Sequence, residues 1–103
     1  MHQGYKNHQT WNVALWISNE YNTYRHWQAR ANEIKDSIKA GCAQMKVAFL
    51  PAEKAARFLL ADELEATFTV HPLADDATMY SDILGHALGQ VDWHEVADSI
   101  LDE

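Results

Sequence analysis

The sequence predicts an all-α fold, a compact bundle of four or five helices in which residues 1–103 form a single helical domain. A chain of 103 residues with 48% apolar and 22% charged residues is long enough to bury one hydrophobic core. Its apolar residues recur at intervals of three and four, the period of a helix that packs along one face. Cys42 is the only cysteine, so no internal disulfide can contribute to this core.

The first predicted helix runs from about Trp11 to Ser18, with Thr10 as its N-cap. Its apolar residues occupy nearly the whole circumference, which is typical of a central, buried helix. We therefore expect the aromatic residues between Tyr5 and Tyr21 to belong mainly to the core and not to a stacking platform for nucleic acid.

The second predicted helix starts between Ser18 and Asn22 and ends before Gly41, a residue suited to the left-handed position after a helix end. Five apolar residues spaced three, four, three and four apart predict a packing seam along its whole length. They are Tyr24, Trp27, Ala31, Ile34 and Ile38.

The middle of the chain gives weaker signals. Residues 42–50 fit either a short helix or a connecting segment. A helix then begins with Pro51 at its first position, and Asp62 and Glu65 suggest a capping pair that restarts it in a new direction. Residues 67–70 alternate like a strand, although no second strand is available to pair with them.

Two short helices are predicted at the C-terminal end. Asp75 or Asp76 caps the first, which Gly89 closes, and Asp92 with Glu95 forms the N-terminal cap of the second. The apolar stripes of these helices are Met79, Ile83, Leu84, Ala87 and Leu88, and then Trp93, Val96, Ala97, Ile100 and Leu101. The predicted core consists of Trp11, Leu15, Trp16, Trp27, Ile34, Ile38, Ile83, Leu88, Trp93, Val96 and Ile100.

The net charge of −7 is unevenly distributed. Residues 1–50 hold six Lys/Arg and three Asp/Glu, whereas residues 51–103 hold two and twelve, with no Lys or Arg after Arg57. Such asymmetry indicates an interaction face. Spacings of three, three and four align a row of acids on one side of the last helix, and we expect a partner to bind there, although acids on an outward face can also serve only solubility. The predicted partner-binding residues are Asp82, Asp92, Glu95, Asp98, Asp102 and Glu103, extended by Asp75 and Asp76.

No catalytic motif or cofactor site is recognisable, so we expect a binding protein and not an enzyme. The stretch His94 to Asp98 has zinc-protease spacing, but Asp98 stands where the second histidine belongs. The last helix carries acids and no basic residue, so DNA phosphates would repel it. Two alternatives stay open: a DNA-binding or regulatory module that uses the basic half from Lys6 to Lys46, and a divalent-metal hydrolase built on the C-terminal acids.

The N-terminal segment lacks an apolar core of the kind found in signal peptides, and no run approaches the roughly 18 apolar residues of a membrane span. A single free thiol suits a reducing compartment. These observations predict a cytoplasmic protein that makes no contact with the membrane.

Residues 5–16 follow the pattern Tyr-x-Asn-x-x-Thr-Trp-Asn-Val-x-Leu-Trp, and residues 91–97 read Val-Asp-Trp-x-Glu-Val-Ala after a helix with Tyr80, Asp82 and Leu84. These two blocks resemble a family of small, all-helical proteins carried by phages, plasmids and other mobile elements. The resemblance implies an accessory protein of a mobile element and transfers no catalytic residue. Small acidic proteins in that setting often disarm host defence, so we expect an anti-CRISPR or anti-restriction inhibitor. Its partner would be a host defence or nucleic-acid-binding protein, with no direct contact to nucleic acid.

Overall fold

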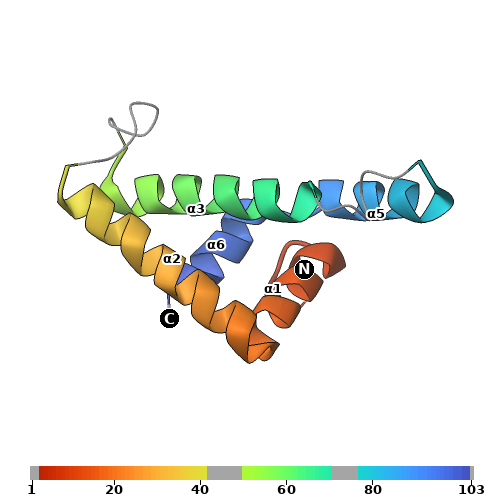
Figure 1. Ribbon diagram of the computed structural model, residues 1–103, viewed down its shortest axis with the longest axis horizontal. Helices are drawn as coiled ribbons and strands as arrows, with labels where there is room; N and C mark the ends of the chain where they lie inside the picture. The colour runs from red at the N-terminus through yellow and green to blue at the C-terminus, as the bar shows by residue number, and fades with distance from the viewer. Residues whose placement is uncertain (1–2, 42–49, 71–76, 103) are drawn as a thin grey trace.

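The computed structural model describes residues 3–41, 50–70 and 77–102, in which every regular element is a helix, as predicted. The five helices of this part of the chain are α1 (His8–Asn19), α2 (Tyr21–Lys39), α3 (Ala52–Thr69), α5 (Met79–Gly89) and α6 (Trp93–Leu101). The end of α2 lies near the start of α3, and the two helices diverge from there (Figure 1). Helix α6 lies between them, and α1 packs against α2 and α6. None of the described helices is both long and apolar enough to cross a membrane.

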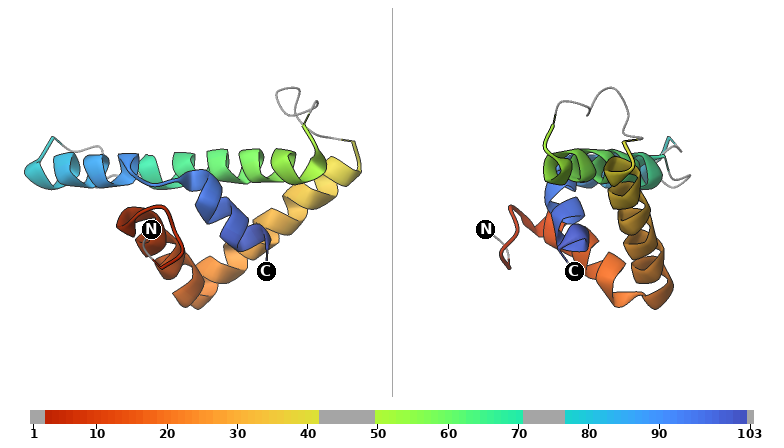
Figure 2. Two further views of the ribbon diagram at one scale, coloured as in Figure 1. Left: turned by 180° about the vertical axis from the view of Figure 1, so that it is seen from behind. Right: turned by 90° about the vertical axis from the view of Figure 1, so that its left-hand side faces the viewer.

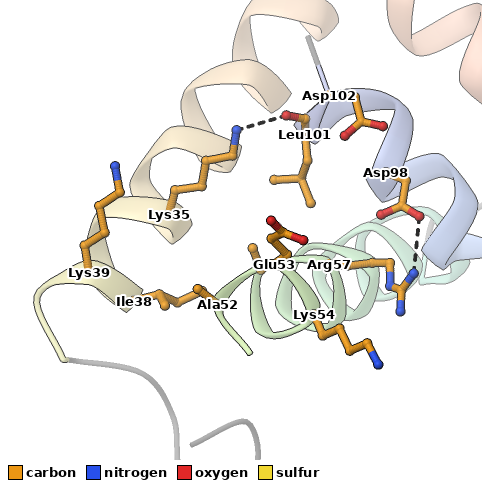
Figure 3. Close-up of a pocket in the computed structure, with 11 residues that line it drawn as sticks. Lys35, Ile38, Lys39, Ala52, Glu53, Lys54, Arg57, Asp98, Leu101 and Asp102 are labelled. Atoms are coloured by element: carbon orange, nitrogen blue, oxygen red, sulfur yellow. Dashed lines mark hydrogen bonds and ion pairs between the residues drawn. The ribbon is translucent and has the colours of Figure 1, made fainter. Parts of the chain in front are cut away.

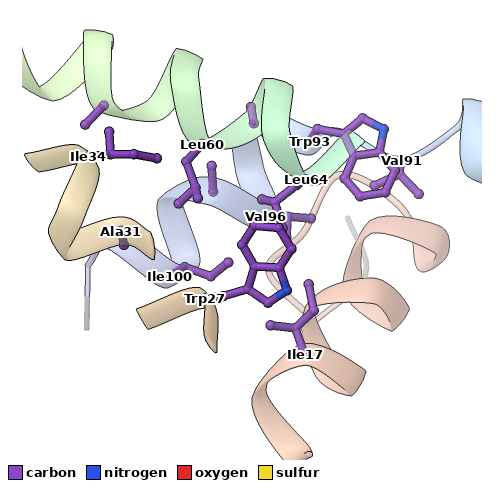
Figure 4. Packing of buried hydrophobic residues seen from close by; sticks show 13 residues of the cluster. Ile17, Trp27, Ala31, Ile34, Leu60, Leu64, Val91, Trp93, Val96 and Ile100 are labelled. Atoms are coloured by element: carbon purple, nitrogen blue, oxygen red, sulfur yellow. The ribbon is translucent and has the colours of Figure 1, made fainter. Parts of the chain in front are cut away.

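The core lies where one face each of α2, α3 and α6 meet, with Ile17 added from α1 (Figure 4). Leu60, Leu64 and Val96 have no exposed surface. The ring of Trp93 stacks almost parallel on Phe68, with 6.0 Å between the ring centroids. Burial of these side chains removes apolar area from water and supplies the main stabilisation of the bundle.

Helix α2 follows its prediction closely. It begins at Tyr21 and ends at Lys39, and Gly41 beyond it has a φ of +78°, the left-handed conformation that glycine adopts without strain. The predicted seam faces the core: Trp27, Ala31 and Ile34 are buried, while the two end positions are half-buried.

Helix α1 begins earlier than predicted, and its cap is Asn7, whose side chain accepts the backbone N–H of Thr10. The prediction that Thr10 is the cap is therefore wrong, because Thr10 lies inside the helix and is fully buried. The prediction that Trp16 belongs to the core is also wrong, since its side chain is 67% exposed. A short helix at the edge of the bundle can bury only one side, and Thr10, Ala14 and Ile17 occupy that side.

Helix α3 runs without interruption from Ala52 to Thr69, so the predicted restart at Asp62 and Glu65 and the strand-like segment 67–70 are both wrong. Pro51 is the N-cap residue and not the first helical residue. The buried stripe of Leu60, Ala61 and Leu64 continues to the half-buried Phe68, which keeps the end of the helix on the core. The hydroxyls of two threonines there donate to backbone carbonyls four residues earlier, a bond compatible with helical geometry.

The predictions for the last two helices have mixed outcomes. Thr78, and not Asp75 or Asp76, is the N-cap of α5, where it forms a capping box with Ser81. Ile83 is 60% exposed and not in the core. Two predictions for helix α6 are confirmed. Asp92 is its N-cap, and every residue of its apolar stripe is buried except Leu101, which is half-buried. Asp75, Asp76, Glu103 and residues 42–49 lie outside the described residues.

Replacing Trp93 with alanine should lower the free energy of unfolding by about 3–5 kcal/mol, because the buried indole loses its contact with Phe68 and leaves a cavity. The matched control is Trp16→Ala, which removes the same side chain from an exposed site and should cost about 0.5 kcal/mol. Urea denaturation at low protein concentration measures both values. Equal losses for the two variants would contradict the described core.

Candidate functional site

A network of hydrogen bonds joins the N-terminal ends of α1 and α6. Asn7 Oδ1 accepts the backbone N–H of Thr10 at 2.9 Å and the Thr10 hydroxyl at 2.6 Å. The Thr10 hydroxyl oxygen accepts the backbone N–H of Asp92 at 2.9 Å, and Asn7 Nδ2 donates to the carbonyl of Gln90 at 2.7 Å. The buried hydroxyl thus acts as donor and acceptor at once, which a buried polar group requires.

Asp92 and Glu95, two of the predicted partner-binding residues, belong to the same network. Asp92 Oδ1 accepts the backbone N–H of Glu95 at 3.2 Å and so caps α6. Glu95 Oε1 accepts the backbone N–H of Lys6 at 2.7 Å and ties the segment before α1 to α6. Both carboxylates therefore have structural roles, and the sequence blocks 5–16 and 91–97 meet at this place in the fold.

The other predicted acids are more accessible. Asp98 Oδ2 lies 3.4 Å from Arg57 Nη1, and both side chains are more than a third exposed, so this ion pair adds little stability. Asp102 is exposed after the end of α6 and makes no ion pair with any residue that the structure describes. Asp82 is exposed on α5, whose main neighbour is α3. The structure therefore does not gather the five described acids of this set into one continuous surface.

An acidic groove, defined here by Asp62, Glu65 and Asp92, lies between α3 and the start of α6 and has a volume of about 280 Å³. Phe58, Trp93 and His94 also line it, and its lining contains no Lys or Arg. Sequence reasoning missed the two α3 acids as surface residues because it assigned them to a helix cap. Only the packing of α3 against α6 brings them beside Asp92.

A second groove, of about 540 Å³, lies at the other end of the α3–α6 contact, where α2 also ends (Figure 3). Its charged lining is mixed: Lys35, Lys39, Lys54, Arg57, Glu53, Asp98 and Asp102. The row of acids predicted on α6 thus begins at the acidic groove and ends among cations. Because charges of both signs screen one another there, this groove does not select a ligand of one charge.

Several cations of the basic half are engaged in joining helices. Arg30 of α2 makes a bidentate ion pair with Glu63 of α3, with both N–O distances at 2.8 Å, and a further contact to Glu33. The hydrogen bond to Glu63 is the main cause that raises the pKa of Arg30 above its ordinary value. Lys35 Nζ donates to the carbonyl of Leu101 at 2.9 Å, at the negative end of α6. These side chains are less available to bind phosphates.

Within residues 3–41, 50–70 and 77–102, no group of three or more His, Cys, Asp or Glu side chains is placed to hold a metal ion. His94, at the start of the stretch with zinc-protease spacing, is exposed and lies against the ring of Phe58, with 6.1 Å between the ring centroids. The described residues therefore contain no ligand cluster that would support a divalent-metal hydrolase.

Comparisons of the chain with protein-family models, with curated proteins and with solved structures find no match in any of the three.

Replacing Thr10 with valine keeps the shape of the side chain but removes both hydroxyl bonds. The part-buried N–H of Asp92 then loses its acceptor, and we expect a loss of about 1–3 kcal/mol in the free energy of unfolding. Thr67→Val is the matched control, because the Thr67 hydroxyl bonds only to the carbonyl of Glu63 on an exposed surface. Urea denaturation should show a change near 0.5 kcal/mol for this control. If both variants lose the same stability, the Thr10 bridge is not the connection between α1 and α6.

Proposed function

We propose that this chain is a binding protein and not an enzyme, and that its acidic groove contacts a host defence protein at a surface built to bind nucleic acid. The observation that carries the proposal is the convergence of Asp62, Glu65 and Asp92 from two helices in a groove with no Lys or Arg in its lining. Carboxylates that line one groove without Lys or Arg attract a basic surface.

The surroundings of the acidic groove strengthen this field. No Lys or Arg occurs after Arg57, so the part of α3 beyond that residue, α5 and α6 contribute acids and no cation of their own. Two of these acids, Glu63 and Asp98, pair with Arg30 and Arg57. Duplex DNA presents about one negative charge per 1.7 Å of its axis, and proteins that bind it carry complementary basic grooves. A compact acidic surface can occupy such a groove, mainly by raising the association rate, and would thereby compete with the nucleic acid.

The resemblance to proteins of mobile elements suggests which partners to test. An accessory protein of a phage or plasmid gains from blocking CRISPR effectors or restriction enzymes, both of which bind DNA in basic channels. Direct DNA binding by the basic half is the less favoured alternative. Two of its cations, Arg30 and Lys35, are engaged with Glu63 and Leu101, which leaves fewer cations for phosphates.

The test compares two double reversals of equal charge. Asp62→Lys with Glu65→Lys changes the acidic groove, whereas Asp98→Lys with Asp102→Lys changes the mixed end of α6. Each chain is immobilised and exposed to host lysate, and the retained proteins are challenged with duplex DNA. We expect duplex DNA to displace the partner of the parent chain, and the groove reversal to lower its retention at least about tenfold, more than the α6 reversal does.

Three outcomes count against the proposal: a partner that duplex DNA does not displace, equal retention by the parent and the groove reversal, or a gel shift of duplex DNA by the parent itself. Circular dichroism of each variant confirms that the helices are intact. Asp92 is left unchanged in both variants, because its side chain caps α6 and a loss of binding would then be ambiguous.

A further inference from the structure

Helix α5 exposes an apolar face that the bundle does not cover. It extends beyond the end of α3, away from the other helices (Figure 1 and the left view of Figure 2). Its inner residues, such as Leu88, pack against the core, but three large side chains point outward. Met79, Tyr80 and Ile83, the α5 apolar face, are 66%, 77% and 60% exposed. Met79 precedes Ile83 by four residues and Tyr80 precedes it by three, so the three side chains lie on one surface of the helix.

A second exposed apolar surface lies where α1 turns into α2. Trp16 and Tyr21 stand on either side of this bend and are 67% and 69% exposed. The guanidinium of Arg25 lies over the ring of Tyr21, 5.7 Å from its centroid, and makes no ion pair with a described residue. Trp, Tyr and Arg are the residues most enriched among those that dominate binding energy at protein interfaces. We call Trp16, Tyr21 and Arg25 the aromatic corner.

Each surface carries an exposed charge that can pair with one on the other surface. Asp82 is exposed beside the α5 apolar face, in a region of the sequence without any Lys or Arg. At the aromatic corner Arg25 supplies a positive charge, and Glu20, exposed in the bend itself, supplies a negative one. Arg25 can face Asp82 of a second copy, so two copies of the chain supply both halves of such an interface.

We infer that the protein forms a symmetric homodimer in which the α5 apolar face of each copy packs against the aromatic corner of the other, with Arg25 of one copy facing Asp82 of its partner. Two such contacts related by a two-fold axis close the assembly and leave no unpaired surface for further growth.

The exposed area is sufficient for a dimer of the smaller kind. At their present exposure, Trp16, Tyr21 and Tyr80 would each bury roughly 100 Å² or more. In two copies these aromatics account for about half of the ~1,200 Å² of a stable interface. Met79, Ile83 and the neighbouring polar residues supply the remainder.

Exchanging the two charges provides a sharp test. Arg25→Asp alone and Asp82→Arg alone each place like charges at both contacts, and each variant should weaken dimerisation at least about tenfold. A mixture of the two variants restores opposite charges at both contacts, because each copy then faces its complement. Sedimentation velocity over a wide concentration range should therefore show a dimer for the parent, monomers for each variant, and a heterodimer for the mixture.

The control is Lys54→Asp, an equal change of charge outside both surfaces, which should leave the dimer intact. A parent chain that stays monomeric at every concentration would overturn the inference and assign the α5 apolar face to contact with a different protein. A mixture that stays monomeric while the parent dimerises would overturn the pairing of Arg25 with Asp82. The outcome is independent of the proposed function, because neither residue belongs to the acidic groove.

Discussion

The position of α1 against α6 depends on one part-buried hydrogen bond, from the backbone N–H of Asp92 to the hydroxyl of the buried Thr10. It connects two helix starts that are 82 residues apart in sequence. The same hydroxyl donates to Asn7, which caps α1, and Asp92 caps α6. A buried hydroxyl with only one of these partners would be costly, so both helices are held in a single relative position. This constraint holds α1 against the start of α6, whose apolar stripe completes the core between α2 and α3.

The same constraint separates structural acids from accessible ones. Asp92 and Glu95 are engaged in caps and in the bond to Lys6, so their carboxylates are needed for the fold whatever else they contact. Asp62 and Glu65, from the opposite helix, are exposed at the acidic groove. The electrostatic character of the surface is therefore decided by which acids the fold leaves accessible, and not by their number.

The accuracy of sequence-based prediction varies along the chain for identifiable reasons. The seam of α2 and the stripe of α6 were predictable, because one face of each helix is apolar and the other is charged. Trp16 and Ile83 were assigned to the core wrongly, since their helices are apolar on more than one side and only packing decides which side is buried. Leu60 and Leu64, both fully buried, were not identified because the apparent cap at Asp62 and Glu65 divided α3 in two.

Four properties could be read from the sequence without a structure: the helical class, the bounds of α2, the cap of α6 and the division of charge between the two halves of the chain. These properties follow from local periodicity, capping chemistry and composition, which require no knowledge of neighbours in space. The tertiary structure alone decided that Asn7 and Thr10 meet Asp92, that two acids of α3 join a groove with α6, and that α5 and the α1–α2 bend expose large apolar side chains. Such features depend on which helix faces pack together, and that choice is made by long-range contacts that no short stretch of sequence encodes.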